Sequence, residues 1–148
     1  MSSSVPEIQL VVPSRIESLA VINAVAEEVS NQLDFDEEAR NAITISVVEA
    51  GTNAIEHGNG WDSSKPTEVL FRQENGALII LIRDRGEGFD LEKLGDPLAQ
   101  ENMFAERGRG VYILRSFMDE VDFRFEAGQG TECRLVKYLP HKSLRTDE

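Results

Sequence analysis

The chain has 148 residues, the size of one domain, and is long enough to bury a core without disulfides or structural metal. Its 27 acidic against 15 basic side chains give a net charge of −12, which disfavours nucleic acid and anionic membranes as nonspecific partners and leaves basic protein surfaces attractive. The single cysteine, Cys133, excludes an internal disulfide and fits a reducing compartment. Because the N-terminus lacks a basic, apolar leader and the longest apolar run, 77–82, is too short for a bilayer, we expect a soluble cytoplasmic protein with a single domain over 1–148.

The first expected elements are a strand and a helix. Apolar residues alternate with others over 8–12, as in a strand with one buried face, and Pro13 ends it. Ser14 and Glu17 have the spacing of a capping box that would begin a helix. Apolar residues then recur at helical intervals: Ile16, Leu19, Ile22, Val25 or Ala26, Val29 and Leu33.

A second helix follows almost at once. Either Asp34 together with Glu37, or Asp36 alone, can cap its N-terminus. The glycine-rich and polar segment 58–66 is expected to end it. Its apolar side consists of Ala39, Ile43, Val47, Ala50 and Ala54.

A hairpin is predicted next, with strands at 67–73 and 77–82 joined through Asn75-Gly76, because both turn residues tolerate positive φ. The second strand is apolar on both faces, as a central strand would be. Residues 84–109 then lack periodicity and read as a long loop, which in a compact domain is usually functional or disordered.

A third helix is predicted to open directly after Gly110, followed by a second hairpin with strands at 121–126 and 131–138 around the turn 127–130. A polar tail over 141–148 ends the chain. The apolar side of this helix consists of Val111, Leu114, Phe117 or Met118, and Val121.

The second helix carries the first candidate motif. Glu49 and Asn53 lie four residues apart and Glu56 three further on, so we expect them to share a polar stripe. An amide oxygen one turn from a carboxylate can hold Mg²⁺ while the carboxylate takes a proton from an attacking hydroxyl. A solvated polar face is the alternative, and His57 is interpreted as a helix-end histidine rather than a ligand.

The second motif follows the central strand. Asp84 would place a carboxylate at the sheet edge, where it could accept from the amino group of adenine, and Gly86 and Gly88 would let a flat base approach closely. An ordinary polar turn is the alternative. Phe89 is assigned to the core rather than to the pocket.

The third motif surrounds the start of the third helix. Gly108 and Gly110 would leave backbone N–H groups free for phosphates, and Arg107 and Arg109 could hold the terminal phosphate during its transfer. A hinge with two solvated arginines is the alternative. No Gly-Lys-Ser/Thr follows, so this is no P-loop. Thr131, after the last turn, could contact the base or belong to a plain hairpin.

Taken in this order, the three motifs point to an ATP-dependent protein, and from about residue 8 to 138 the chain resembles the GHKL ATPase superfamily. Within it, the chain resembles the small anti-sigma-factor serine/threonine-protein kinases. The most specific pieces are Glu49-x-x-x-Asn53, Asp84-x-Gly86-x-Gly88-Phe89 and the segment 106–121. The resemblance implies an α+β fold, a two-layer α/β sandwich of the Bergerat type, with helices on one face of a mixed, mostly antiparallel sheet.

The resemblance also implies roles for individual residues. Glu49 looks like the general base, Asn53 the Mg²⁺ ligand, and Asp84 the adenine contact. Arg107 looks like the arginine that senses the terminal phosphate, within a lid over about 90–107. The remaining cofactor contacts would be Gly86, Gly88, Gly108, Arg109, Gly110 and Thr131.

Such kinases resemble two-state switches, in which a homodimer sequesters a sigma factor when it is ATP-bound, and instead binds a STAS-domain antagonist and phosphorylates a serine on it. The leading hypothesis is therefore an ATP·Mg²⁺-dependent serine kinase that is also an anti-sigma factor. Two alternatives stay open: a binding module that takes up nucleotide without transferring phosphate, and a catalytic domain that phosphorylates a histidine on another chain.

Overall fold

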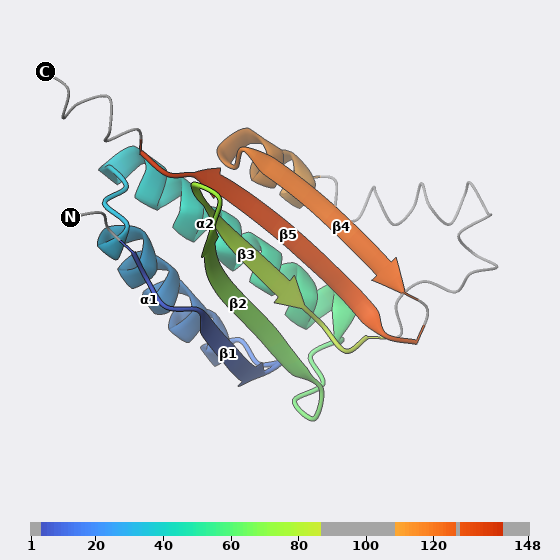
Figure 1. Ribbon diagram of the computed structural model, residues 1–148. Helices are drawn as coiled ribbons and strands as arrows, with labels where there is room; N and C mark the ends of the chain where they lie inside the picture. The colour runs from blue at the N-terminus through green and yellow to red at the C-terminus, as the bar shows by residue number, and fades with distance from the viewer. Residues whose placement is uncertain (1–3, 87–108, 127, 141–148) are drawn as a thin grey trace, which may run out of the picture.

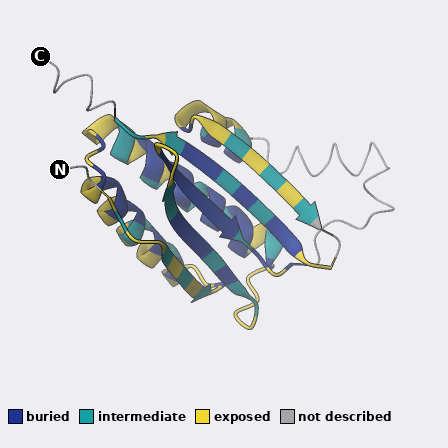
Figure 2. Ribbon diagram, viewed as in Figure 1, coloured by how far each residue is buried: buried dark blue, intermediate teal, exposed yellow. Residues whose placement is uncertain are grey.

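The computed structural model describes residues 4–86, 109–126 and 128–140, which form a sheet with helices packed on one face (Figure 1). Exposed residues appear along α1, and buried residues concentrate in the central strands (Figure 2). In chain order the elements are β1 (Ile8–Pro13), α1 (Glu17–Gln32), α2 (Glu37–Asn53), the π-helix η1 (Ala54–Gly58), β2 (Pro66–Glu74), β3 (Ala77–Arg83), β4 (Glu120–Glu126) and β5 (Gly130–Tyr138). A further helical segment covers 109–117.

The five strands lie in the order β1-β2-β3-β5-β4, and every pair among them is antiparallel. This confirms the predicted two-layer α+β fold, although the five described strands form an antiparallel sheet rather than a mixed one. The β2–β3 hairpin turns through Asn75 and Gly76, at φ of 50° and 77°, as the Asn-Gly pair predicts. Strand β3 is central, as its apolar character on both faces predicts, so both of its edges are hydrogen-bonded to neighbouring strands.

The hydrophobic core lies between the helices and one face of the sheet. Because side chains alternate along a strand, the β3 residues Leu78, Ile80 and Ile82 face this core. Cys133 on β5 also belongs to it and is 5% exposed, so the cysteine is buried as expected. No helix in the described part of the chain is long and apolar enough to cross a membrane.

Helix α1 does not begin with the predicted capping box. Its N-cap is Ile16, without any side-chain cap, and Ile16 is 64% exposed rather than part of the apolar face. Ser14 is fully buried and its hydroxyl donates to Lys65 O at 2.6 Å, so it is committed to a contact across the fold and cannot cap the helix. The rest of the predicted face is confirmed at its centre, where Ile22 and Ala26 are fully buried.

Helix α2 is capped by Asp36 alone, whose Oδ1 accepts from Ala39 N at 2.8 Å; this confirms one of the two predicted caps. Its last turn widens into η1, so the α-helical register does not continue from Asn53 to Glu56. Glu56 is exposed, and the predicted three-residue stripe is therefore limited to Glu49 and Asn53. His57 lies exposed in the last turn of η1, as a helix-end histidine would.

The third helix differs from its prediction at both ends. Arg109 and Gly110 are already helical rather than preceding the helix, and Val121 belongs to β4. Leu114 and Met118 face the core, as predicted, whereas Phe117 is 38% exposed. The residues before 109 that would show where this helix begins lie outside the described ranges.

Candidate functional site

Asp84 and Thr131 meet at the end of the sheet where β3 ends and β5 begins. Asp84 N donates to Thr131 O at 3.0 Å, and Thr131 N donates to Asp84 Oδ1 at 3.1 Å. The same Oδ1 accepts from Gly86 N at 2.9 Å. Asp84 is 4% exposed and Thr131 9%, so backbone amides fix the direction of a buried carboxylate.

Three glycines enclose Asp84, two of them missed by the sequence analysis. A Cβ on Gly58 would overlap the Asp84 carboxylate, and a Cβ on Gly130 would overlap the Asp84 carbonyl. The predicted Gly86 is also confined, because a Cβ there would run into the carbonyl of Gly58. The glycines at this site therefore let three chain segments pack closely on one another, whatever their relation to a ligand.

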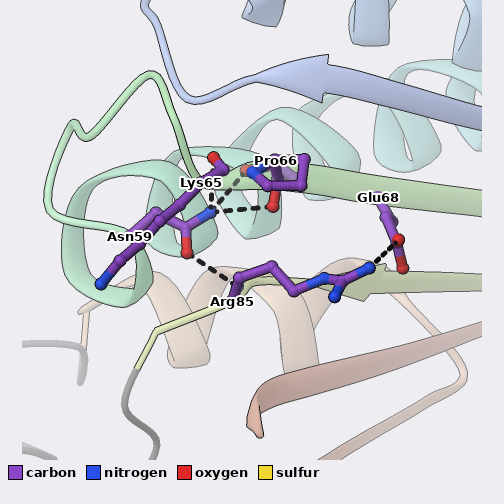
Figure 3. Close-up of polar contacts among 6 residues, drawn as sticks. Asn59, Lys65, Pro66, Glu68 and Arg85 are labelled. Carbon is purple, nitrogen blue, oxygen red and sulfur yellow. Dashed lines mark hydrogen bonds and ion pairs between the residues drawn. The ribbon is translucent and has the colours of Figure 1, made fainter.

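Asn59 contacts the residues that follow Asp84, and the sequence analysis placed it only within a turn-rich segment. It is 2% exposed, and its side chain contacts the start of β2 and the backbone of Arg85 (Figure 3). The Arg85 guanidinium extends the other way and pairs with Glu68 on β2 at 2.7 Å. No local sequence signal marks such a residue, because its partners come from segments far apart in the chain.

A second cluster lies where α2 meets the helix at 109–117. A Cβ on Gly110 would overlap the Glu49 carboxylate and come within 3.3 Å of Asn53 Nδ2. Glu49 is half-buried and Asn53 is 9% exposed. The structure therefore brings together three of the predicted residues, and Gly110 must lack a side chain for the Glu49 carboxylate to stay where it is.

Asn53 Nδ2 is buried without a hydrogen-bond partner in the described part of the chain. A buried amide left in this state costs about 1–3 kcal/mol, so such groups are rare in proteins. An amide that points toward Gly110 and beside a carboxylate is suited to meet a polar ligand. No group of three or more His, Cys, Asp or Glu that could hold a metal occurs within the described ranges.

The two clusters are neighbours along the chain, joined by η1, which starts after Asn53 and ends at Gly58 against Asp84. A hollow of about 410 Å³ is lined by Asp84 and Thr131 together with charged residues of the sheet, and neither Glu49 nor Asn53 lines it. The described residues thus show a sheet-end cluster around Asp84 and a helix-side cluster around Glu49. Gly88, Phe89, Arg107, Gly108 and the lid over 90–107 lie outside the described residues, and Arg109 is exposed.

The charged groups near Asp84 are arranged in pairs. Arg83 lies 3.7 Å from Glu132 and Arg85 lies 2.7 Å from Glu68, so the residues flanking Asp84 direct their cations to strands β5 and β2. In the loop after η1, hydrogen bonds from the Ser64 hydroxyl and then from its backbone N–H lower the pKa of Asp62 below its ordinary value of 3.8. That carboxyl is fully exposed and serves the turn.

Known proteins resemble this chain over most of its length. The model of the histidine kinase-like ATPase domain matches residues 12–137. Serine-protein kinase RsbW of Bacillus subtilis is 26% identical over 145 residues, which cover 94% of this chain and 89% of the relative. Serine-protein kinase RsbW of Oceanobacillus iheyensis is 27% identical over 147 residues, covering 95% and 92%.

Two solved structures share the fold. The crystal structure of the RsbU and RsbW domains of Rv1364c from Mycobacterium tuberculosis matches with a TM-score of 0.68 at 20% identity, covering 91% of this chain and 33% of that longer one. The catalytic domain of the histidine kinase ThkA matches with a TM-score of 0.53 at 12% identity, covering 91% and 97%. The resemblance to the GHKL ATPases is therefore confirmed, and the chain belongs to the histidine kinase-like ATPase domain family.

Proposed function

We propose that this protein is an ATP-dependent serine protein kinase and an anti-sigma factor, which phosphorylates a STAS-domain antagonist and sequesters a sigma factor. The observation that carries the proposal is the packing of Glu49 and Asn53 against Gly110 in a member of an ATPase family. The relatives named serine-protein kinase match over 94% and 95% of this chain, and this supports the same reaction class.

Glu49 is proposed as the general base. Its carboxylate is half-buried on α2 and is held next to the helix that carries the third motif. A serine hydroxyl is a weak nucleophile, and a carboxylate within hydrogen-bond reach can take its proton as the bond to the γ-phosphorus forms and the bond to the leaving ADP oxygen breaks. Most of the remaining catalysis in phosphoryl transfer is positioning and charge neutralisation. Arg107 is proposed to contribute charge, and Arg109 to bind the cofactor.

Asn53 is proposed to hold the magnesium ion of Mg·ATP. The amide oxygen of Asn53 would be the ligand, since Mg²⁺ is commonly held by one or two protein oxygens and completes its shell with phosphates and water. The buried Nδ2, which has no described partner, would donate to a phosphate oxygen. When bound, the ion would neutralise charge on the phosphates. The role of the protein is to hold the Asn53 amide and the Glu49 carboxylate next to Gly110.

Asp84 is proposed to accept from the adenine amino group, with Thr131 and Gly86 as further base-side contacts. An ionised carboxylate offers about four lone-pair sites, so it can accept from a base in addition to backbone amides. Burial at 4% exposure would strengthen this hydrogen bond and make its absence costly. Gly88, Gly108 and Gly110 are proposed to line the approach of the base and the phosphates.

The partners follow from the resemblance. A sigma factor is proposed to be bound in the ATP state, and a STAS-domain antagonist to be the phosphate acceptor. A net charge of −12 suits a basic surface on the sigma factor. We further propose a homodimer acting in the cytoplasm, without direct contact to nucleic acid or membrane.

Incubation of the protein with radiolabelled Mg·ATP and a STAS-domain partner tests the reaction. The wild type should yield acid-stable phosphoprotein, and Glu49→Gln should lower the rate by about 10²–10⁴-fold while still binding ATP. The matched control is Glu56→Gln, which makes the same chemical change at an exposed position seven residues on and should transfer at the wild-type rate. Equal rates for Glu49→Gln and the wild type would exclude Glu49 as the base. Tight ATP binding without transfer would indicate a binding module, and acid-labile product would indicate a histidine acceptor.

A further inference from the structure

The buried side chain of Asn59 has only one possible orientation. Its Nδ2 lies near four acceptors: Ser14 Oγ at 2.8 Å, Pro66 O at 3.1 Å, Thr67 Oγ1 at 3.2 Å and Lys65 O at 3.3 Å. Exchanging the amide oxygen and nitrogen would place an oxygen against two carbonyl oxygens, which is repulsive. The donor side of Asn59 is therefore fixed on the start of β2 (Figure 3).

Because the donor side is fixed, the acceptor side is fixed too. Asn59 Oδ1 accepts from Arg85 N at 2.7 Å, a short bond to the peptide that directly follows Asp84. The next amide, Gly86 N, turns back to Asp84 Oδ1. The turn at 84–86 is thus held between an external acceptor and the Asp84 side chain, and the direction of the carboxylate depends on both.

The neighbouring residue strengthens this coupling. Gly58 immediately precedes Asn59, its α-carbon lies against the Asp84 carboxylate, and its carbonyl lies against Gly86. The pair Gly58–Asn59 therefore encloses the turn at 84–86 on two sides. Since Asn59 is also hydrogen-bonded to β2, the position of the turn at 84–86 depends on the position of β2.

We infer that Asn59 is a positioning residue for purine recognition, which acts through the Arg85 amide to aim the Asp84 carboxylate at the exocyclic amino group of adenine. This inference rests on the proposed function, because it requires that Asp84 reads the base. It assigns a consequence beyond folding: Asn59 sets the preference for a 6-amino purine nucleotide over a 6-oxo one. Inosine triphosphate differs from ATP at this position, where it presents a carbonyl oxygen that a carboxylate would repel.

The sharpest test removes the amide hydrogen and leaves Asn59 in place. Arg85→Pro deletes the N–H that Asn59 accepts from, and it also loses the ion pair with Glu68. Arg85→Ala loses only the ion pair and is the matched control. Affinities for Mg·ATP and Mg·inosine triphosphate are measured by calorimetry for both variants and the wild type. We expect Arg85→Ala to keep the wild-type ratio of the affinities for ATP and inosine triphosphate. In Arg85→Pro this ratio should fall about tenfold, mainly through weaker ATP binding.

A second pair keeps the inference testable if Arg85→Pro does not fold. Asn59→Ala removes both halves of the amide, whereas Thr67→Ala removes one acceptor of the donor side and leaves the bond from Arg85 N to Asn59 Oδ1 in place. The preference for ATP should fall about tenfold in Asn59→Ala and stay at the wild-type value in Thr67→Ala, even though both variants become less stable. A purely structural role would weaken both nucleotides equally in both variants.

The outcomes separate this inference from the proposed function. If the wild type binds neither nucleotide, or binds both with equal affinity, the proposed role of Asp84 fails and the inference fails with it. If the wild type prefers ATP but this preference is unchanged in Arg85→Pro or in Asn59→Ala, the proposed function stands and the positioning role of Asn59 is overturned.

Discussion

The sheet-end cluster around Asp84 and the helix-side cluster around Glu49 are built in different ways. Asp84 is bonded to backbone amides of two segments, so its geometry is fixed by the sheet itself. Glu49 and Asn53 are placed by the packing of two helices, and Asn53 Nδ2 has no partner among the described residues. One cluster is already satisfied before a ligand arrives, whereas the other contains a polar group that a ligand would complete. Substitutions in the first should therefore affect folding, and substitutions in the second should mainly affect activity.

The largest effect on folding is expected for Gly130→Ala. Gly130 has φ of +91°, and its Cβ would overlap the carbonyl of Asp84, a backbone atom that cannot move aside. Strain and overlap together should lower the free energy of unfolding by about 3 kcal/mol. Urea denaturation followed by circular dichroism measures the loss.

Gly128→Ala is the matched control for this change. Gly128 has φ of +76° in the same turn, but nothing lies within 4 Å of its Cβ position. It should lose only about 1 kcal/mol, from the backbone strain alone. Equal losses in the two variants would show that the contact with Asp84 contributes nothing to stability.

The next effect is on catalysis, in Gly110→Ala. Here the new Cβ would meet the carboxylate of Glu49, the end of a flexible side chain, so the carboxylate can move and the fold can survive. A helical Gly→Ala change also favours the helix by about 0.5–1 kcal/mol, which offsets part of the crowding. Phosphate transfer to the partner should fall at least tenfold, on the order of the effect of a misplaced catalytic group, while the unfolding midpoint stays near the wild-type value.

Gly51→Ala serves as the control for Gly110→Ala. Its Cβ would make ordinary contacts of 3.4 Å with Leu19 and 3.5 Å with Ile22, away from the Glu49 carboxylate. Transfer should be unchanged and stability equal or slightly higher. A comparable loss of transfer in both glycine variants would show that the helix, and not the Glu49 carboxylate, responds.

Local patterns predicted most of the fold and only part of the site. The hairpin at Asn75-Gly76 and the Asp36 cap were predictable because the residues that determine them are adjacent in sequence. The capping box at Ser14 failed because that hydroxyl is recruited by Asn59, 45 residues further along the chain. A long-range partner of this kind competes with the local capping contact, and the periodicity of the sequence does not reveal it.

The same reasoning explains which site residues could be predicted. Glu49, Asn53 and Asp84 stand out because helical spacing and the end of an apolar strand are local signals. Gly58, Asn59 and Gly130 could not be assigned, because their roles come from contacts with a turn at 84–86 that only the fold brings near. The π-helix after Asn53, which moved Glu56 off the predicted stripe, had no recognisable sequence signal either.

Two asparagines sharpen the comparison between the clusters. Asn53→Ala removes a buried amide whose Nδ2 has no described partner, so the nucleotide-free protein should change its free energy of unfolding by less than about 1 kcal/mol. Asn59→Ala removes bonded donors and an acceptor and should cost about 2–3 kcal/mol. Thermal unfolding with and without Mg·ATP tests both: Asn53→Ala should lose the stabilisation by Mg·ATP. A large destabilisation of nucleotide-free Asn53→Ala would show that the amide is already satisfied.

The smallest effect concerns Asp62 in the loop that follows Asn59. Hydrogen bonds from the Ser64 hydroxyl and then from Ser64 N–H lower the pKa of this carboxyl below 3.8 in the folded state. The associated stability is therefore present above pH 3.8 and is lost as the pH falls through the folded pKa, and full exposure keeps it too small to detect by denaturation. Ser64→Ala removes the largest cause, so the Asp62 carboxyl, followed by carbon-detected NMR, should titrate at a higher pH than in the wild type. An unchanged midpoint in Ser64→Ala would mean that the hydroxyl does not bond the carboxylate in solution, and that this turn, unlike the Asn59 corner beside it, is not held by its side chains.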